Sequence, residues 1–106
     1  MRKCDATGKT IVSMYNPESE YTIYDGKYWW SDKWDPKDYA KEYDFTKGFF
    51  EQYNELSRHI PRTSLILPGT NENSDYANDS ADAKNCYMTV NAYIAEDCYY
   101  SYAVIF

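Results

Sequence analysis

Two segments near the carboxyl end repeat the same order of residue types, and each carries a cysteine. The segment NCYMT (85–89) is followed by DCYYS (97–101), so Cys86 and Cys98 occupy equivalent places. Three kinds of thiol chemistry are open to such a pair. Free cysteines pack as small hydrophobic residues, a disulfide needs an oxidising compartment, and zinc needs a close-spaced second pair, which is absent here. An odd total of three cysteines favours free thiols in a reducing compartment.

Other residue types offer little for catalysis. His59 is the only histidine and could pair with a cysteine nucleophile, but it lies near a predicted helix end, where a capping role is favoured. Asp75, Asp79 and Asp82 could supply a carboxylate pair for glycoside cleavage, but they lie in the polar first copy of the repeat, where solubility is the favoured explanation. Glycine-rich phosphate loops and a Gly-x-Ser-x-Gly segment are both absent from the sequence. We therefore expect a protein that is not an enzyme, with no catalytic residues, no metal and no cofactor.

Aromatic residues are better candidates for a binding site. Trp29, Trp30 and Trp34 lie beside Tyr28, and adjacent tryptophans on a strand would point to opposite sides. At least one indole should therefore be exposed, where it could stack on a sugar or contact a protein. The alternative is that the three indoles pack between the hairpin and the helices.

The cysteine segments extend into a longer repeat. SDYAN (74–78) aligns with both of them, at spacings of 11 and then 12 residues. In extended strands with alternating faces, Tyr76, Tyr87 and Tyr99 would form a column on one face, and the cysteines would lie on the apolar face. A short fixed period indicates a stack of strands, and we expect the first rungs of a β-solenoid, with Cys86 against Cys98. An apolar end in mid-repeat suggests a truncated parent sequence or an edge that pairs with another chain, and we favour truncation.

The preceding residues predict a ribbon-like β-hairpin and two helices. The hairpin strands are residues 9–15 and 21–24, and a second turn leads to an extended segment at 27–30. Asp35-Pro36 predicts the start of a short helix that runs to about residue 42.

A second helix is predicted from about residue 46 to residue 59, and Pro61 should end it. Its apolar residues recur every three or four positions and predict one buried face that contains Phe45, Phe49, Tyr53, Leu56 and Ile60. Residues 62–67 then predict a strand.

The hairpin has the layout of a zinc ribbon that has lost its ligands. A ribbon needs two Cys-x-x-Cys turns, and the corresponding places here hold Cys4 and Thr7, then Asp25 and Tyr28. With one good ligand of four, we expect no metal at this site.

Several stretches resemble an uncharacterised family of bacterial proteins. They are RKCDATGKTIVSMYNPES, WWSDKWDPKDYAKEYDFTKGFFEQYNELSRHIPR, NCYMTVNAY and EDCYYSY. Longer members carry zinc-ribbon cysteine pairs upstream and Cys-Tyr-rich repeats downstream, and some have Cys-x-x-Cys where this chain has residues 25–28. The resemblance implies an architecture and a longer parent chain, and it implies no activity.

Composition sets the remaining limits. The 106 residues fit one small unit, in which 13 tyrosines replace much of the usual aliphatic core. A net charge of −6 argues against nucleic acid, and the longest apolar run is too short for a membrane span. With no secretion signal, we expect a soluble, cytoplasmic chain.

These observations together predict an α+β fold. Residues 1–67 would form the metal-free ribbon hairpin and helical segment, and residues 68–106 the start of the repeat. The predicted function is a scaffold or interaction module that presents a tyrosine-rich surface to a protein partner. Binding or cleavage of carbohydrate is the alternative.

Overall fold

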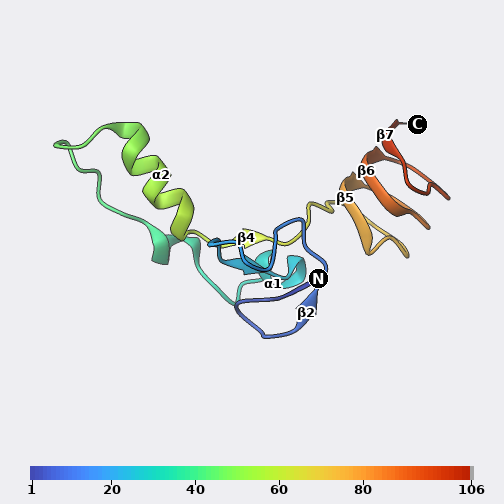
Figure 1. Ribbon diagram of the computed structural model, residues 1–106, viewed down its shortest axis with the longest axis horizontal. Helices are drawn as coiled ribbons and strands as arrows, with labels where there is room; N and C mark the ends of the chain where they lie inside the picture. The colour runs from blue at the N-terminus through green and yellow to red at the C-terminus, as the bar shows by residue number, and fades with distance from the viewer. Residues whose placement is uncertain (106) are drawn as a thin grey trace.

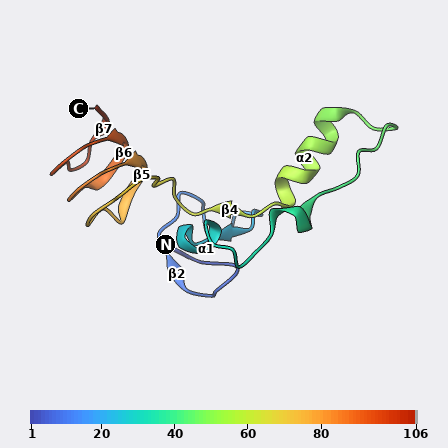
Figure 2. The same cartoon turned by 180° about the vertical axis from the view of Figure 1, so that it is seen from behind.

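The chain is elongated in the computed structural model, which describes residues 1–105. Its principal extents are 52 × 29 × 27 Å and its radius of gyration is 16.3 Å, against about 13 Å for a compact domain of 100 residues. Helix α2 (Phe49–His59) lies at one end, and strands β5 (Tyr76–Ala81), β6 (Tyr87–Tyr93) and β7 (Tyr102–Ile105) lie at the other (Figures 1 and 2). The mixture of helices and small sheets confirms the α+β class.

Four two-residue strands organise the N-terminal part. Strand β1 (Arg2–Lys3) pairs antiparallel with β2 (Thr10–Ile11), and β3 (Ile23–Tyr24) pairs parallel with β4 (Arg62–Thr63). The predicted hairpin between residues 9–15 and 21–24 is therefore wrong, and so is the length of the strand expected at 62–67.

A tight turn explains the actual pairing. The Gly8 N–H donates to the Cys4 carbonyl, and Gly8 has a φ of 72°, which a residue without a Cβ adopts freely. This turn folds β2 back onto β1. Cys4, Ile11 and Ile23 then form a small core against which Tyr15 and Tyr21 pack.

Helix α1 (Gly26–Trp29) replaces the extended segment expected at 27–30. The Trp29 N–H donates to the Asp25 carbonyl, and the Trp29 indole donates to the Pro61 carbonyl at 3.1 Å. Anchoring of the indole to the residue just before β4 favours a helical turn here, so the expectation of a strand is wrong.

Both helices that the sequence predicts are present with changed limits. The 3-10 helix η1 (Pro36–Tyr39) begins at the predicted residues, with the Asp35 carboxylate accepting from the Lys37 N–H, but it ends before residue 42. Helix α2 ends before Pro61 as predicted, and it begins at Phe49 rather than near residue 46. The Asp44 carboxylate instead holds Thr46 in a local turn ahead of the helix.

The predicted burial of the α2 apolar face is wrong. None of the residues of α2 is buried, and Phe49 is 57% exposed. Amphipathicity is present, but no other described segment covers it. The structure describes no helix long and apolar enough to cross a membrane within residues 1–105.

The C-terminal strands form a three-stranded parallel sheet in the order β5-β6-β7. Tyr76 pairs with Tyr87, the register then shifts, and Ala77 pairs with Thr89, an offset of 12 residues that continues between β6 and β7. Neighbouring strands therefore align equivalent positions of the sequence repeat.

Side chains on these strands point inward at every third residue. Thr89 is fully buried, whereas Met88 and Val90 beside it are 52% and 40% exposed. The predicted alternation of faces, which grouped Thr89 with Tyr87 and Met88 with Cys86, is therefore wrong. The buried positions are Ser74, Ala77, Ser80, Ala83, Cys86, Thr89, Ala92 and Ala95.

Left-handed backbone explains the period of three. Residues with φ between 48° and 58° precede nearly every inward position, and each one bends the chain. Asparagine and aspartate adopt this conformation most easily among non-glycine residues, and they occupy many of these places. The left-handed residues are Asn73, Asp79, Asp82, Asn85, Met88, Asn91, Ile94, Asp97, Tyr100 and Ala103.

Candidate binding surface

The predicted tyrosine column is present at one corner of the parallel sheet. Tyr76, Tyr87 and Tyr99 are all exposed. The rings of Tyr76 and Tyr87 lie 5.4 Å apart between centroids. Tyr87 next contacts the ring of Tyr100 at 5.6 Å, edge to face. Tyr100 is thus a member of the column that the sequence repeat did not single out.

Main-chain hydrogen bonds hold the column in place. The Tyr87 N–H donates to the Cys98 carbonyl at 3.0 Å, and the Tyr100 N–H donates to the Tyr87 carbonyl at 2.9 Å. Both donors belong to residues of the column itself. The tyrosine rings are therefore presented from a backbone with little freedom to move.

An amide ladder runs beside the rings. The Asn73 side-chain amide donates to Asn85 Oδ1 at 3.0 Å, and the Asn85 amide donates to Asp97 Oδ1 at 3.1 Å. Sequence reasoning missed this ladder, although its signal was visible: the residue before each repeat position 74, 86 and 98 is Asn or Asp.

The ladder and the tyrosines line one open hollow of about 390 Å³. Its polar groups are the side chains of Asn73, Asp75 and Asn85, and its apolar walls are tyrosine rings. A hollow of this kind can take planar or extended groups by ring contact while amides and a carboxylate bond to their polar edges. The lining residues are Asn73, Asp75, Tyr76, Asn85, Cys86, Tyr87, Tyr99 and Tyr100.

The two repeat cysteines pack together beneath this surface, as predicted. Cys86 is buried in a core cluster to which Cys98 adds, and all three cysteines of the chain are free thiols within the described residues. The Cys86 thiol lies 3.4 Å from the Lys84 carbonyl and 3.5 Å from that of Ala95. Partial burial, together with the neighbouring Cys86, raises the pKa of the Cys98 thiol. A raised pKa disfavours the thiolate, so Cys98 is not set up as a nucleophile.

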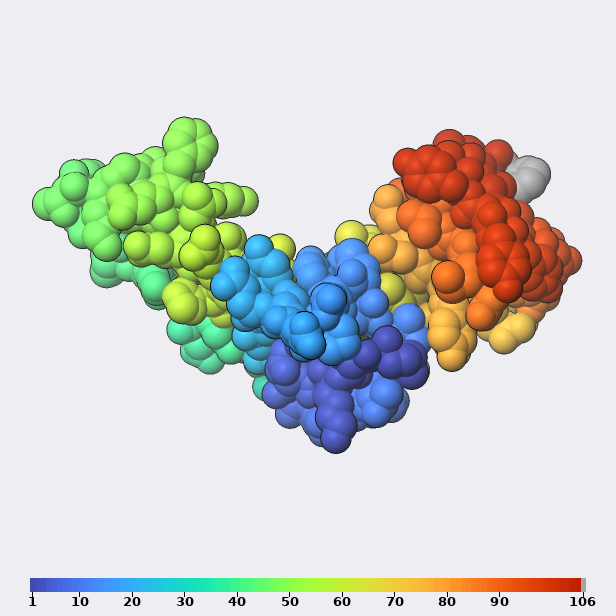
Figure 3. Space-filling view, in the orientation of Figure 1, coloured from blue at the N-terminus to red at the C-terminus, as the bar shows by residue number. Residues whose placement is uncertain are grey.

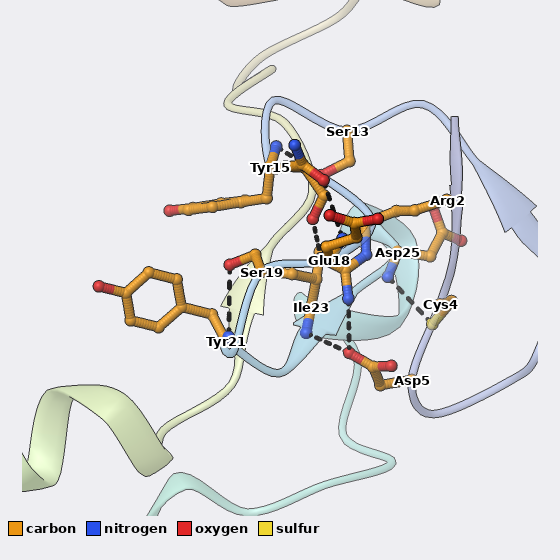
Figure 4. Close-up of polar contacts among 11 residues, drawn as sticks. Arg2, Cys4, Asp5, Ser13, Tyr15, Glu18, Ser19, Tyr21, Ile23 and Asp25 are labelled. Carbon is orange, nitrogen blue, oxygen red and sulfur yellow. Dashed lines mark hydrogen bonds and ion pairs between the residues drawn. The ribbon is translucent and has the colours of Figure 1, made fainter.

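The N-terminal turn brings together three of the four residues compared with ribbon ligands. The Asp25 N–H donates to Cys4 Sγ at 3.2 Å (Figure 4), and the Thr7 side chain also bonds to this sulfur. Burial pushes the pKa of Cys4 upward, but these bonds and the backbone N–H groups of Thr7 and Ala6 outweigh it, so the pKa lies below its usual value. Within residues 1–105, no group of three or more His, Cys, Asp or Glu side chains is arranged to hold a metal.

Two of the three tryptophans act in packing. The Trp34 indole donates to the Trp29 carbonyl at 2.8 Å, and Trp34 also packs against Tyr24 at 5.5 Å. Burial and the hydroxyl of Tyr39 raise the pKa of Tyr24 in this cluster. Trp30 is the exposed indole, and its ring lies nearly perpendicular to that of Trp29.

The remaining catalytic candidates are dispersed. His59 closes α2, and the repeat cysteines belong to the C-terminal sheet, which both views place on the other side of the N-terminal residues (Figures 1 and 2). Asp82 accepts from the Thr70 N–H, while Asp79 adopts left-handed backbone and Asp75 lines the hollow. Each carboxylate thus has a separate place in the repeat.

Comparison of the chain with protein-family models, with curated proteins and with solved structures gave no match.

Proposed function

We propose that this protein is a non-enzymatic interaction module that binds a protein partner through the tyrosine column. The observation that carries the proposal is the row of exposed rings of Tyr76, Tyr87, Tyr99 and Tyr100 around one hollow. Tyrosine is among the residues that most often dominate protein binding energy, because it offers a large rigid ring and a polar tip.

We further propose that residues from about 74 onward form the first rungs of a β-solenoid. The 12-residue offset supports this, since it recurs in the parallel bridge between Lys84 and Glu96. That bridge is made by the bonds of Lys84 N–H to the Ala95 carbonyl and of Asp97 N–H to the Lys84 carbonyl. The regular inward positions support it as well, because each coil would then stack small side chains on those of the next. A solenoid supplies the repeated surface that a binding column needs.

Selection of extended peptides from a random displayed library, on the immobilised full chain, tests the binding role. The double variant Tyr76→Ser, Tyr87→Ser should weaken binding of the selected peptides by at least about tenfold if both rings contribute. Tyr102→Ser is the matched control, because Tyr102 is exposed on the same sheet without lining the hollow. Equal binding to the double variant and the wild type would contradict the proposal.

Carbohydrate is the second candidate partner, and one observation favours it. The amides of Asn73 and Asn85 lie beside tyrosine rings, the combination that holds a sugar by its hydroxyl groups and its apolar face. Titration with soluble polysaccharides, followed by the NMR signals of the column tyrosines, tests this role. Unchanged signals throughout would count against carbohydrate.

A further inference from the structure

Helix α2 and the segment just before it form an arm, residues 43–59, that carries the largest group of exposed aromatic residues outside the tyrosine column. Tyr43, Phe45, Phe49, Phe50 and Tyr53 are between 48% and 91% exposed. Their rings form two contacting groups: Tyr43 meets Phe45 at 4.9 Å, and Phe49 meets both Phe50 and Tyr53 at 5.4 and 6.1 Å between centroids. Tyr43 of the first group and Phe49 and Tyr53 of the second line the same hollow. The arm projects away from the C-terminal strands (Figure 3). These five residues are called the aromatic arm patch below.

The size of the patch is close to that of one side of a protein interface. At about 150–250 Å² of surface for each aromatic side chain, these exposed fractions leave on the order of 500–800 Å² uncovered. The largest apolar patch of a monomer is usually about 300–600 Å², and a standard interface buries about 800 Å² on each partner. The patch therefore approaches the area that each partner buries in an interface of standard size.

The helix that carries the patch also lacks support of its own. Helix α2 has 11 residues, and none of them is buried. Isolated helices shorter than about 12–15 residues are marginal in water. Its N-cap is Gly48 without a side-chain bond, and the chief local restraint is Gln52, whose amide donates to the Asp44 and Lys47 carbonyls. Packing against another surface would supply the missing stabilisation.

The surroundings of the patch indicate what that surface is. Phe49, Tyr53 and Leu56 form part of an open hollow of about 370 Å³ next to the helix, which is large enough to admit an aromatic side chain. Its rim carries both signs of charge, with two lysines against three carboxylates: Lys41 and Lys47, then Glu42, Asp44 and Glu55. A partner of uniform charge would meet repulsion from part of this rim, whereas a surface with the same mixture can pair both signs.

We propose that the aromatic arm patch is a homodimer interface, in which α2 of one copy packs against α2 of a second copy. A two-fold axis through the patch makes it self-complementary, because each copy then offers both the hollow and the exposed rings of Phe45 and Phe50. The dipoles of helices that cross antiparallel also oppose one another favourably. This interface lies away from the tyrosine column and leaves both columns of the dimer free.

Sedimentation equilibrium of the full chain over a range of concentrations tests the proposal. The wild type should dimerise, and far-ultraviolet circular dichroism should show helix content rising over the same concentrations, because association stabilises α2. Tyr53→Ala should raise the dissociation constant on the order of 10- to 100-fold. Alanine has the higher helix propensity, so weaker association could not be attributed to a weakened helix.

Arg58→Ala is the matched control. Arg58 lies on the opposite side of α2 from Tyr53 by helical spacing, its side chain is exposed, and its ion pair with Glu20 is long at 3.9 Å. The dissociation constant should change less than about twofold, as for a residue outside the interface. A wild type that stays monomeric up to about 1 mM would overturn the proposal. So would a dimer that Tyr53→Ala leaves unchanged, since it would be built on another surface.

Discussion

Replacement of Thr89 by alanine tests the inward period of three in the C-terminal sheet. Thr89 is fully buried, and its hydroxyl lies 3.3 Å from the Tyr87 carbonyl and 3.1 Å from the Cys98 carbonyl. Met88, one residue earlier, is half exposed. An alternating strand would reverse these two environments. Thr89→Ala and Met88→Ala therefore discriminate between the two periods.

The cost of Thr89→Ala follows from what the side chain loses. A buried methyl group contributes about 0.8 kcal/mol and a hydrogen bond about 0.5–1.5 kcal/mol, with a further cost for the small cavity. Neither carbonyl is left unpaired, because Tyr100 N–H still donates to Tyr87 and Tyr87 N–H to Cys98. We expect a loss of about 1.5–3 kcal/mol for Thr89→Ala and below about 1 kcal/mol for Met88→Ala.

Amide hydrogen exchange of residues 86–104, measured on the full chain, reports the local loss of stability in the sheet. Thr89→Ala should speed exchange about 10- to 140-fold if these amides exchange by opening of the sheet. Thr89→Val keeps the shape and loses only the hydroxyl, so its effect should be smaller. Faster exchange in Met88→Ala than in Thr89→Ala would refute the inward assignment.

Three further predictions concern the N-terminal part and the arm. Phe49→Ala should lower the free energy of unfolding by less than about 1 kcal/mol, because the ring is more than half exposed. Chemical denaturation of the dilute monomer measures this loss. A loss of about 3–5 kcal/mol, typical of a buried phenylalanine, would mean that the face is core. Because burial and the Tyr39 hydroxyl raise the pKa of Tyr24, the unfolded chain loses this proton first as the pH rises above about 10, and the free energy of unfolding should fall there. The urea midpoint should fall less between about pH 9 and about pH 11 in Tyr24→Phe than in the wild type. An equal fall of the midpoint in both proteins would rule out this cause. If the turns at Cys4 and Asp25 keep ribbon geometry, a triple variant whose three added thiols join Cys4 should bind near-stoichiometric zinc by elemental analysis. The wild type is the control, and a metal-free triple variant would argue against that geometry. The added thiols are Thr7→Cys, Asp25→Cys and Tyr28→Cys.

Part of the C-terminal sheet was predictable because similar residues recur every 11 or 12 positions. Tyr76 and Tyr87 pair in register, and Cys86 packs with Cys98. The period of three was missed because its cause is backbone conformation. Asn and Asp signal left-handed residues, but Met88 and Ile94 occupy the same conformation with side chains that give no such signal. The outward position of Met88 could therefore not be read from hydrophobicity.

The N-terminal errors have a different cause. Strands of two residues, such as β2 and β3, are too short to carry a periodic pattern, so their partners could not be identified from the sequence. Pro61 and Asp35 were informative because their effects on helix ends are local. The apolar stripe of α2 correctly indicated an amphipathic helix, but a stripe does not identify the surface that covers it.

The 12-residue register has a consequence for how this part of the chain tolerates changes in length. Deletion of a single residue within β6 would move every later inward side chain to the outside and place a tyrosine or a charge beneath the sheet. Duplication of residues 84–95 would instead add one strand in register, widen the sheet by about 4.8 Å, and extend the tyrosine column by one ring.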